Sequence, residues 1–120
     1  MKLDYYFILL LTDPPGPPLI KALPHVFSLT LSWNSSDQDI NNIRILDYRI
    51  KVLDGSTLKR VFIYTAITRT SLEIEKLARN RTYIVEIQAR NEVGYGEIAN
   101  ITATTLLAGK ISLYGFHLLL

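Results

Sequence analysis

The stretch that decides the fold is LARNRTYIVEIQARNEVGYG, residues 77–96. From residue 83 onwards its side chains alternate between a mostly apolar and a mostly polar face. The apolar positions are Tyr83, Val85, Ile87 and Ala89, and the positions between and after them are Ile84, Glu86, Gln88 and Arg90. A period of two is typical of a β-strand with one face buried and one face in water. Asn91 and the turn Gly94-Tyr95-Gly96 end the predicted strand.

The start of this strand carries a second signal. Leu77 precedes Tyr83 by six residues, across a polar corner. A leucine, a corner and a tyrosine ahead of an alternating strand predict a tyrosine corner, in which the ring joins the core and the hydroxyl bonds to the backbone upstream. We therefore expect Leu77 and Tyr83 to be structural residues.

Similar signals predict further strands on either side. The clearest one covers residues 27–33, whose apolar positions are Phe27, Leu29, Leu31 and Trp33. Trp33 is expected in the core. In the strand expected at residues 45–53, the inward side chains are Tyr48, Ile50 and Val52, and the outward ones are Asp47, Arg49 and Lys51. Other strands are expected at residues 19–23, 59–65, 71–75 and 97–105. No helical period appears, so six or seven short strands predict an antiparallel β-sandwich.

Composition sets wide limits on function. A chain of 120 residues with 48% hydrophobic and 20% charged residues fits one packed domain. Its net charge of +2 is too small to indicate nucleic-acid binding. The absence of cysteine excludes disulfides, thiolate metal sites and cysteine nucleophiles, but it does not decide between the cytosol and the cell exterior.

The two ends differ from the middle. Residues 1–13 form a leader or non-domain segment: the run MKLDYYFILLL resembles part of a signal peptide, but Asp4 interrupts it. A stiff proline-rich linker, TDPPGPP, precedes the first strand. Residues 106–120 are an apolar tail outside the domain, which leaves open a truncated membrane span. The domain itself is expected at residues 14–105, as a piece of a longer chain.

In their order along the chain, several segments resemble a fibronectin type III domain. They are PPGPP at 14–18, LTLSW at 29–33, ILDYRI at 45–50, the corner and strand at 77–91, and VGYGE at 93–97. This resemblance implies a seven-stranded antiparallel β-sandwich with an immunoglobulin-like fold. The family often has proline where this chain has Arg79, and glycine near Asn80, so the corner loop is atypical here.

Nothing in the sequence predicts catalysis. The histidines are His25 and His117, and in this fold neither lies near a plausible serine or carboxylate partner. Gly94 and Gly96 could suggest a phosphate loop, but no helix follows them. We expect no enzyme activity, no cofactor and no metal site.

Three Asn-x-Ser/Thr sequons fall in predicted loops or at outward positions. Their acceptors are Asn34, Asn80 and Asn100. Three sequons in a chain of this size favour an extracellular setting, on the plasma membrane or secreted, with the cytoplasm as the alternative. Asn34 directly follows the buried tryptophan and is the least expected of the three to be modified.

Two surfaces are candidates for binding. The first is the loop with Asn91, Glu92, Val93 and Tyr95, in which Tyr95 is the best single contact, although it could instead pack against the end of the sandwich. The second is a basic strip that would bind sulfated polysaccharide. Its members are Arg49, Lys51, Arg90 and one of Lys59 and Arg60, and nearby Asp47, Glu86 and Glu92 dilute their charge.

The resemblance implies a non-catalytic interaction or spacer module of a cell-surface adhesion or receptor protein. Its partners would be other cell-surface or matrix proteins and the neighbouring domains of its own chain. Two alternatives stay open: an intracellular structural module of a muscle-type giant protein, and an accessory domain of a receptor kinase or phosphatase.

Overall fold

The computed structural model describes residues 13–35 and 44–108. Nearly all of the predicted leader and most of the predicted tail lie outside the described residues. Within the described ranges the chain forms seven strands. They are β1 (Pro18–Pro24), β2 (Leu29–Ser35), β3 (Asp47–Asp54), β4 (Arg60–Ile67), β5 (Ser71–Ile74), β6 (Thr82–Arg90) and β7 (Ala99–Thr104).

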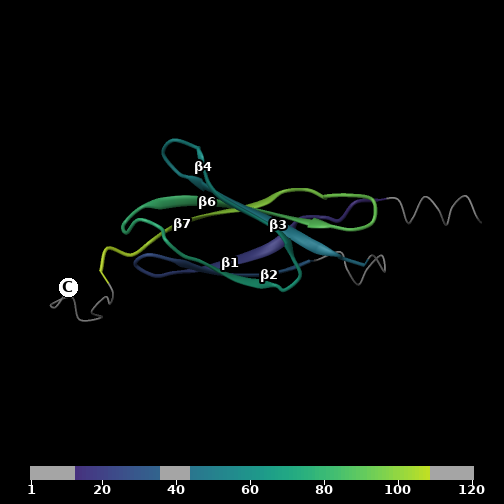
Figure 1. Ribbon diagram of the computed structural model, residues 1–120, viewed down its shortest axis with the longest axis horizontal. Coiled ribbons are helices and arrows are strands. Elements are labelled where there is room, and N and C mark those ends of the chain that lie inside the picture. Colours follow the sequence, from purple (N-terminus) through teal and green to yellow (C-terminus); the bar gives the residue numbers. More distant parts are fainter. Residues whose placement is uncertain (1–12, 36–43, 109–120) are drawn as a thin grey trace, which may run out of the picture.

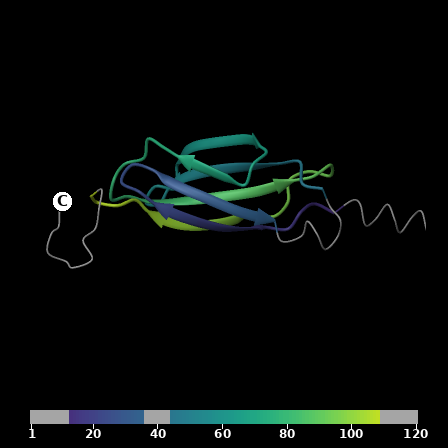
Figure 2. The same cartoon turned by 90° about the horizontal axis from the view of Figure 1, so that it is seen from below.

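The strands form two antiparallel sheets that pack face to face (Figures 1 and 2). One sheet has the strand order β1-β2-β5 and the other has the order β4-β3-β6-β7. The prediction of a seven-stranded antiparallel β-sandwich is therefore confirmed. Among the described residues no helix is long and apolar enough to cross a membrane.

The core lies between the two sheets and is built by the period-two alternation. The four apolar positions of β6, from Tyr83 to Ala89, are all buried, as predicted. Trp33 is also buried, and its ring meets Tyr48 of the opposite sheet edge-on, with centroids 5.5 Å apart. Aromatic pairs favour this T-shaped geometry, which places the ring edge against the π face of its partner. The contact joins the two sheets across the core.

Two side chains differ from the sequence prediction. The alternation predicts Phe27 to face inward, but it is 58% exposed and precedes β2. A turn closes there, because His25 N donates to Ser28 O, while Phe27 O accepts from Leu77 N. Asp47 is predicted to face outward into solvent, but it is buried. The reason is that Arg90, which lies opposite Asp47 on β6, covers the carboxylate and forms a bidentate ion pair with it.

The tyrosine corner is formed. The buried Tyr83 accepts a hydrogen bond at its hydroxyl from Ala78 N, at 2.8 Å. Asn80 in the corner has a φ of 51°, in the left-handed region that favours glycine and is best tolerated by asparagine among other residues. This explains how the atypical loop is accommodated. Thr105 closes the corner, because its Oγ1 donates to Ala78 O and accepts from Arg81 N.

Replacing Tyr83 by phenylalanine should lower the free energy of unfolding by about 1–2 kcal/mol, because the Ala78 N–H loses its hydrogen-bond acceptor inside the corner. Urea denaturation measures this difference. The folded variant should keep the binding properties of the parent. Unchanged stability would mean that this hydrogen bond contributes nothing to the fold.

Candidate functional site

The chain enters and leaves the sandwich at opposite ends of its long axis (Figure 1). At the N-terminal pole, which comprises residues 13–17 and the turn 91–96, Pro15 O accepts from Glu97 N. At the C-terminal pole, Leu106 N donates to His25 O and Leu106 O accepts from Asn80 N. The segments at residues 13–17 and 105–106, where the chain enters and leaves the sandwich, are thus hydrogen-bonded to it.

Asn91 organises the turn at the N-terminal pole. Its Oδ1 accepts from the backbone N–H groups of Val93 (2.8 Å) and Gly94 (3.3 Å). Its Nδ2 donates to Asp13 O, which ties the turn to the incoming chain. Gly94 has a φ of 149°, which favours glycine. The side chain of Asn91 is buried and used inside the turn, so it offers little surface to a partner.

Tyr95 lies on the sheet rather than at the loop tip. The guanidinium carbon of Arg49 is 3.8 Å from its ring centroid, a cation–π contact. Tyr95 is half-buried, and its backbone forms a bridge with Arg90. Tyr95 therefore packs on a side chain of the sheet and keeps part of its surface exposed. Glu92 and Val93 are the exposed residues at the tip, and a contact role for this loop stays a prediction.

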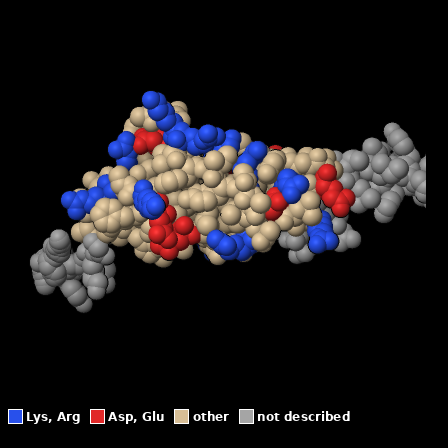
Figure 3. All heavy atoms as spheres, in the orientation of Figure 1, with Lys and Arg blue, Asp and Glu red and all other residues tan. Residues whose placement is uncertain are grey.

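The predicted basic strip is partly neutralised. Arg90 is paired with Asp47 at 2.6 Å, and Arg49 donates to Gln88 Oε1 at 2.6 Å. Lys51 lies opposite Glu86 in the register of β3 and β6. Figure 3 shows a row of Lys and Arg side chains along the upper edge, near β4, and groups of both signs elsewhere on that face. Binding of sulfated polysaccharide stays a prediction.

A second ion pair secures the turn after β3. Asp54 Oδ2 accepts from Arg81 Nε at 2.6 Å, and Asp54 Oδ1 accepts from the backbone N–H groups of Ser56 and Thr57. The dipeptide Asp54-Gly55 predicts the turn from the sequence. The ion pair of Asp54 with Arg81 is not predictable from a local pattern, because the two residues are 27 positions apart. The hydrogen bond from Arg81 is the main reason that the pKa of Asp54 lies below its ordinary value. The hydrogen bond from Arg90 likewise lowers the pKa of Asp47, against a smaller opposing effect of burial.

Acid should destabilise the domain through these two carboxylates. A depressed pKa in the folded state means that the stabilisation is present above the unfolded value, about 3.9, and is lost as the pH falls below it. Urea midpoints should therefore be nearly constant from pH 7 to about pH 5 and fall at lower pH. The Asp54→Asn variant should show a shallower acid decline. An equal decline in parent and variant would contradict the role of Asp54.

The three sequon asparagines are all exposed. Asn34 lies near the end of β2, Asn80 in the tyrosine corner and Asn100 in β7. An N-linked glycan can be attached only to an exposed asparagine, and all three meet this condition. Whether any of the three asparagines carries a glycan stays a prediction.

Reactive groups do not converge in the described part of the chain. His25 Nε2 lies 2.9 Å from Thr30 Oγ1 in an exposed pair. No group of three or more His, Asp or Glu side chains that could hold a metal ion occurs within residues 13–35 and 44–108. His117 lies outside the described residues.

The family model of the fibronectin type III domain matches residues 27–105. The chain therefore belongs to the fibronectin type III family, whose domains are typically non-catalytic structural or binding modules. The FN5 domain of Drosophila Lar is 22% identical and superposes with a TM-score of 0.60, covering 78% of this chain and 99% of that one. At this identity the likeness concerns the fold alone.

Three curated proteins are similar to this chain over most of its length. Titin of Drosophila melanogaster is 32% identical over 102 residues, or 84% of this chain and 1% of titin. Human myosin-binding protein H-like is 31% identical over 96 residues, covering 78% of this chain and 27% of that protein. Ephrin type-B receptor 5 of Gallus gallus is 34% identical over 87 residues, covering 71% of this chain and 8% of the receptor. The chain thus matches only one part of much longer proteins.

Proposed function

We propose that this domain is a non-catalytic spacer and protein-interaction module of a larger cell-surface adhesion or receptor protein. The observation that carries the spacer role is that the chain enters and leaves the sandwich at opposite poles, through segments that are each hydrogen-bonded to it. A neighbour attached at either pole would be held at a fixed distance, because the β-sheets between them do not stretch. Glu92 and Val93, on the turn braced by Asn91, offer contact surface at the N-terminal pole.

The cell-surface setting is supported by the three exposed sequons and by the similarity to an ephrin type-B receptor. The second candidate is a structural module of an intracellular muscle protein. It is favoured by the similarity to titin and myosin-binding protein H-like. An accessory role in a receptor kinase or phosphatase stays a prediction of the sequence analysis.

The spacer role is tested by a distance between spin labels at the two poles. The chain has no cysteine, so Asp13→Cys and Leu107→Cys, both exposed, give two unique labelling sites. Because the nine residues of β6 span about 30 Å at 3.3 Å each, pulsed electron paramagnetic resonance should give one narrow distribution near or somewhat above that length. A broad distribution would contradict a rigid spacer.

The setting is tested on protein isolated from its source cells. Enzymatic removal of N-glycans in heavy-oxygen water marks each occupied asparagine as a labelled aspartate. Label at any of Asn34, Asn80 and Asn100 supports the cell-surface protein. Its absence at all three supports the intracellular alternative.

A further inference from the structure

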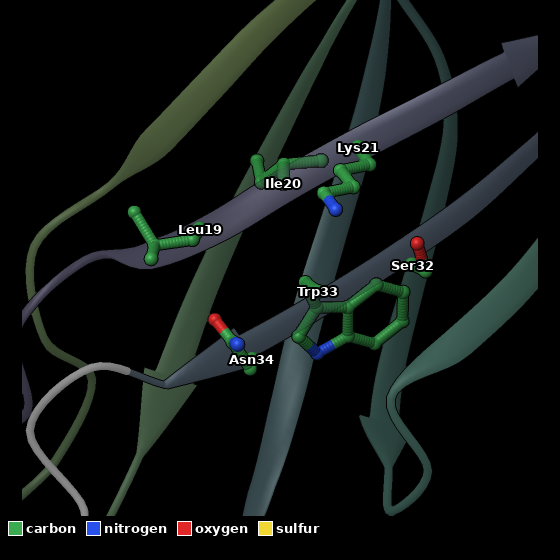
Figure 4. A pocket seen from close by; sticks show the side chains of 6 residues that line it. All are labelled: Leu19, Ile20, Lys21, Ser32, Trp33 and Asn34. Atoms are coloured by element: carbon green, nitrogen blue, oxygen red, sulfur yellow. The ribbon is translucent and has the colours of Figure 1, made fainter.

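A groove runs across the outer face of the three-stranded sheet (Figure 4). It has a volume of about 390 Å³, and the residues that line it are Leu19, Ile20 and Lys21 of β1 and Ser32, Trp33 and Asn34 of β2. These residues form three cross-strand pairs, because Leu19 lies opposite Asn34, Ile20 opposite Trp33 and Lys21 opposite Ser32.

The middle pair differs from the outer two. Trp33 is buried and Ile20 packs against the core, whereas the other four residues are exposed on the outer face. The groove therefore lies between two exposed pairs, one of Leu19 with Asn34 and one of Lys21 with Ser32. It offers an apolar side chain, an ammonium group, a hydroxyl and an amide within a few residues.

Leu19 is exposed over 63% of its surface. A side chain directly opposite it in an antiparallel pair has its Cβ about 4.5–5.5 Å away. That side chain is Asn34, the acceptor of the sequon Asn34-Ser35-Ser36. A group attached to Asn34 Nδ2 would therefore be in reach of Leu19 as soon as it formed.

The other two sequons lack this arrangement. Asn100 lies opposite Glu86, a half-buried charged residue, in the pairing of β7 with β6. Asn80 lies in the corner loop rather than in a strand pair. Only Asn34 among the three has a large exposed apolar side chain as its cross-strand partner.

We propose that Asn34 carries an N-linked glycan whose first N-acetylglucosamine lies in this groove over Leu19. The proposal rests on the cell-surface setting of the proposed function. The donor class is an oligosaccharide joined to a lipid through pyrophosphate. The bond between sugar C1 and the pyrophosphate oxygen breaks, the lipid pyrophosphate leaves with the bonding electrons, and Asn34 Nδ2 bonds to C1 as the amide loses one proton.

The chemistry of the groove suits this sugar. The C–H face and the acetyl methyl group of N-acetylglucosamine are apolar and would cover Leu19, which removes its surface from water. The ring hydroxyls and the acetyl oxygen would face Ser32 Oγ and Lys21 Nζ, both of which donate hydrogen bonds. The sugar would therefore stabilise the fold instead of extending freely into solvent.

The test uses the full chain secreted from cells that add high-mannose glycans. In the Asn80→Gln/Asn100→Gln variant only Asn34 can be occupied, and endoglycosidase H then leaves a single sugar. The trimmed protein should melt about 2–4 °C above the same variant with the added change Asn34→Gln. The matched control, Asn34→Gln/Asn80→Gln, leaves one sugar at Asn100 and should show no such rise over its Asn100→Gln derivative.

Leu19→Ser should abolish the rise at Asn34, and this surface change should leave the domain folded. Nuclear Overhauser contacts between the acetyl methyl group and the Leu19 methyl groups give an independent readout. An unoccupied Asn34, an equal rise in the Leu19→Ser variant, or no such contacts would each overturn the proposal. The melting experiment uses secreted recombinant protein, so it tests the groove independently of where the natural protein is located. The cell-surface setting is tested separately, by the labelled peptides of protein from its source cells.

Discussion

Replacing Ile50 by alanine is expected to lower the free energy of unfolding by about 3 kcal/mol, within the usual range of about 2–5 kcal/mol for such truncations. Ile50 is fully buried at the centre of the four-stranded sheet, where it lies between Ile87 of β6 and Tyr64 of β4. Alanine there loses the buried methyl groups and leaves a cavity that closely paired strands cannot fill. Urea denaturation followed by tryptophan fluorescence measures the loss.

The same sheet offers a control for this prediction. Ile63 of β4 lies opposite Lys51, the neighbour of Ile50, but it faces outward and is 43% exposed. Ile63→Ala should cost less than about 1 kcal/mol, because much of its surface is already in water. Similar losses for the two variants would mean that the inner and outer faces of this sheet are wrongly assigned.

The strands and the core could be predicted because alternation is a local property. The strands β3, β5, β6 and β7 carry apolar side chains at every second position, and a sandwich buries that face whichever strand lies opposite. The tyrosine corner is local as well, since Tyr83 and Ala78 are five residues apart. Trp33, Leu77 and Tyr83 are buried, as these local patterns predict.

The details of the candidate site depend on register, which a single sequence does not contain. Asp47 meets Arg90 across 43 residues, and Tyr95 meets Arg49 on a neighbouring strand. Both contacts arise only when β3 and β6 pair in one particular alignment. Phe27 shows that a local pattern can also mislead. Its position continues the alternation of β2, but the turn at residues 25–28 places it outside the strand, which begins only at Leu29.

The groove at Asn34 also depends on the register. The sequence presents Asn34 as the weakest of the three sequons, because it follows a buried tryptophan. The pairing of β1 with β2 places the exposed Leu19 opposite it, and this makes it the basis of a specific proposal. Cross-strand neighbours, rather than neighbours in sequence, distinguish the three asparagines.

Replacing Gly96 by alanine is expected to loosen the N-terminal pole and to lower the free energy of unfolding by about 2–3 kcal/mol. A Cβ at this position would overlap the carbonyl oxygen of Pro15 and lie 2.6 Å from its carbonyl carbon. These are backbone atoms, so no side chain can turn aside. The incoming chain would have to move, which would weaken the hydrogen bond from Glu97 N to Pro15 O.

The Gly96→Ala variant tests both the stability of the domain and its rigidity as a spacer, and the two properties can be measured in the same protein. Urea denaturation should show the loss, and spin labels at residues 13 and 107 should show a broader distance distribution than in the parent. Val93→Ala in the same turn is the control, because Val93 is 46% exposed and its truncation leaves the hydrogen bonds of Asn91 in place. If Gly96→Ala leaves both stability and distance unchanged, the contact with Pro15 does not fix the chain at this pole, and the rigid-spacer proposal loses its structural support there.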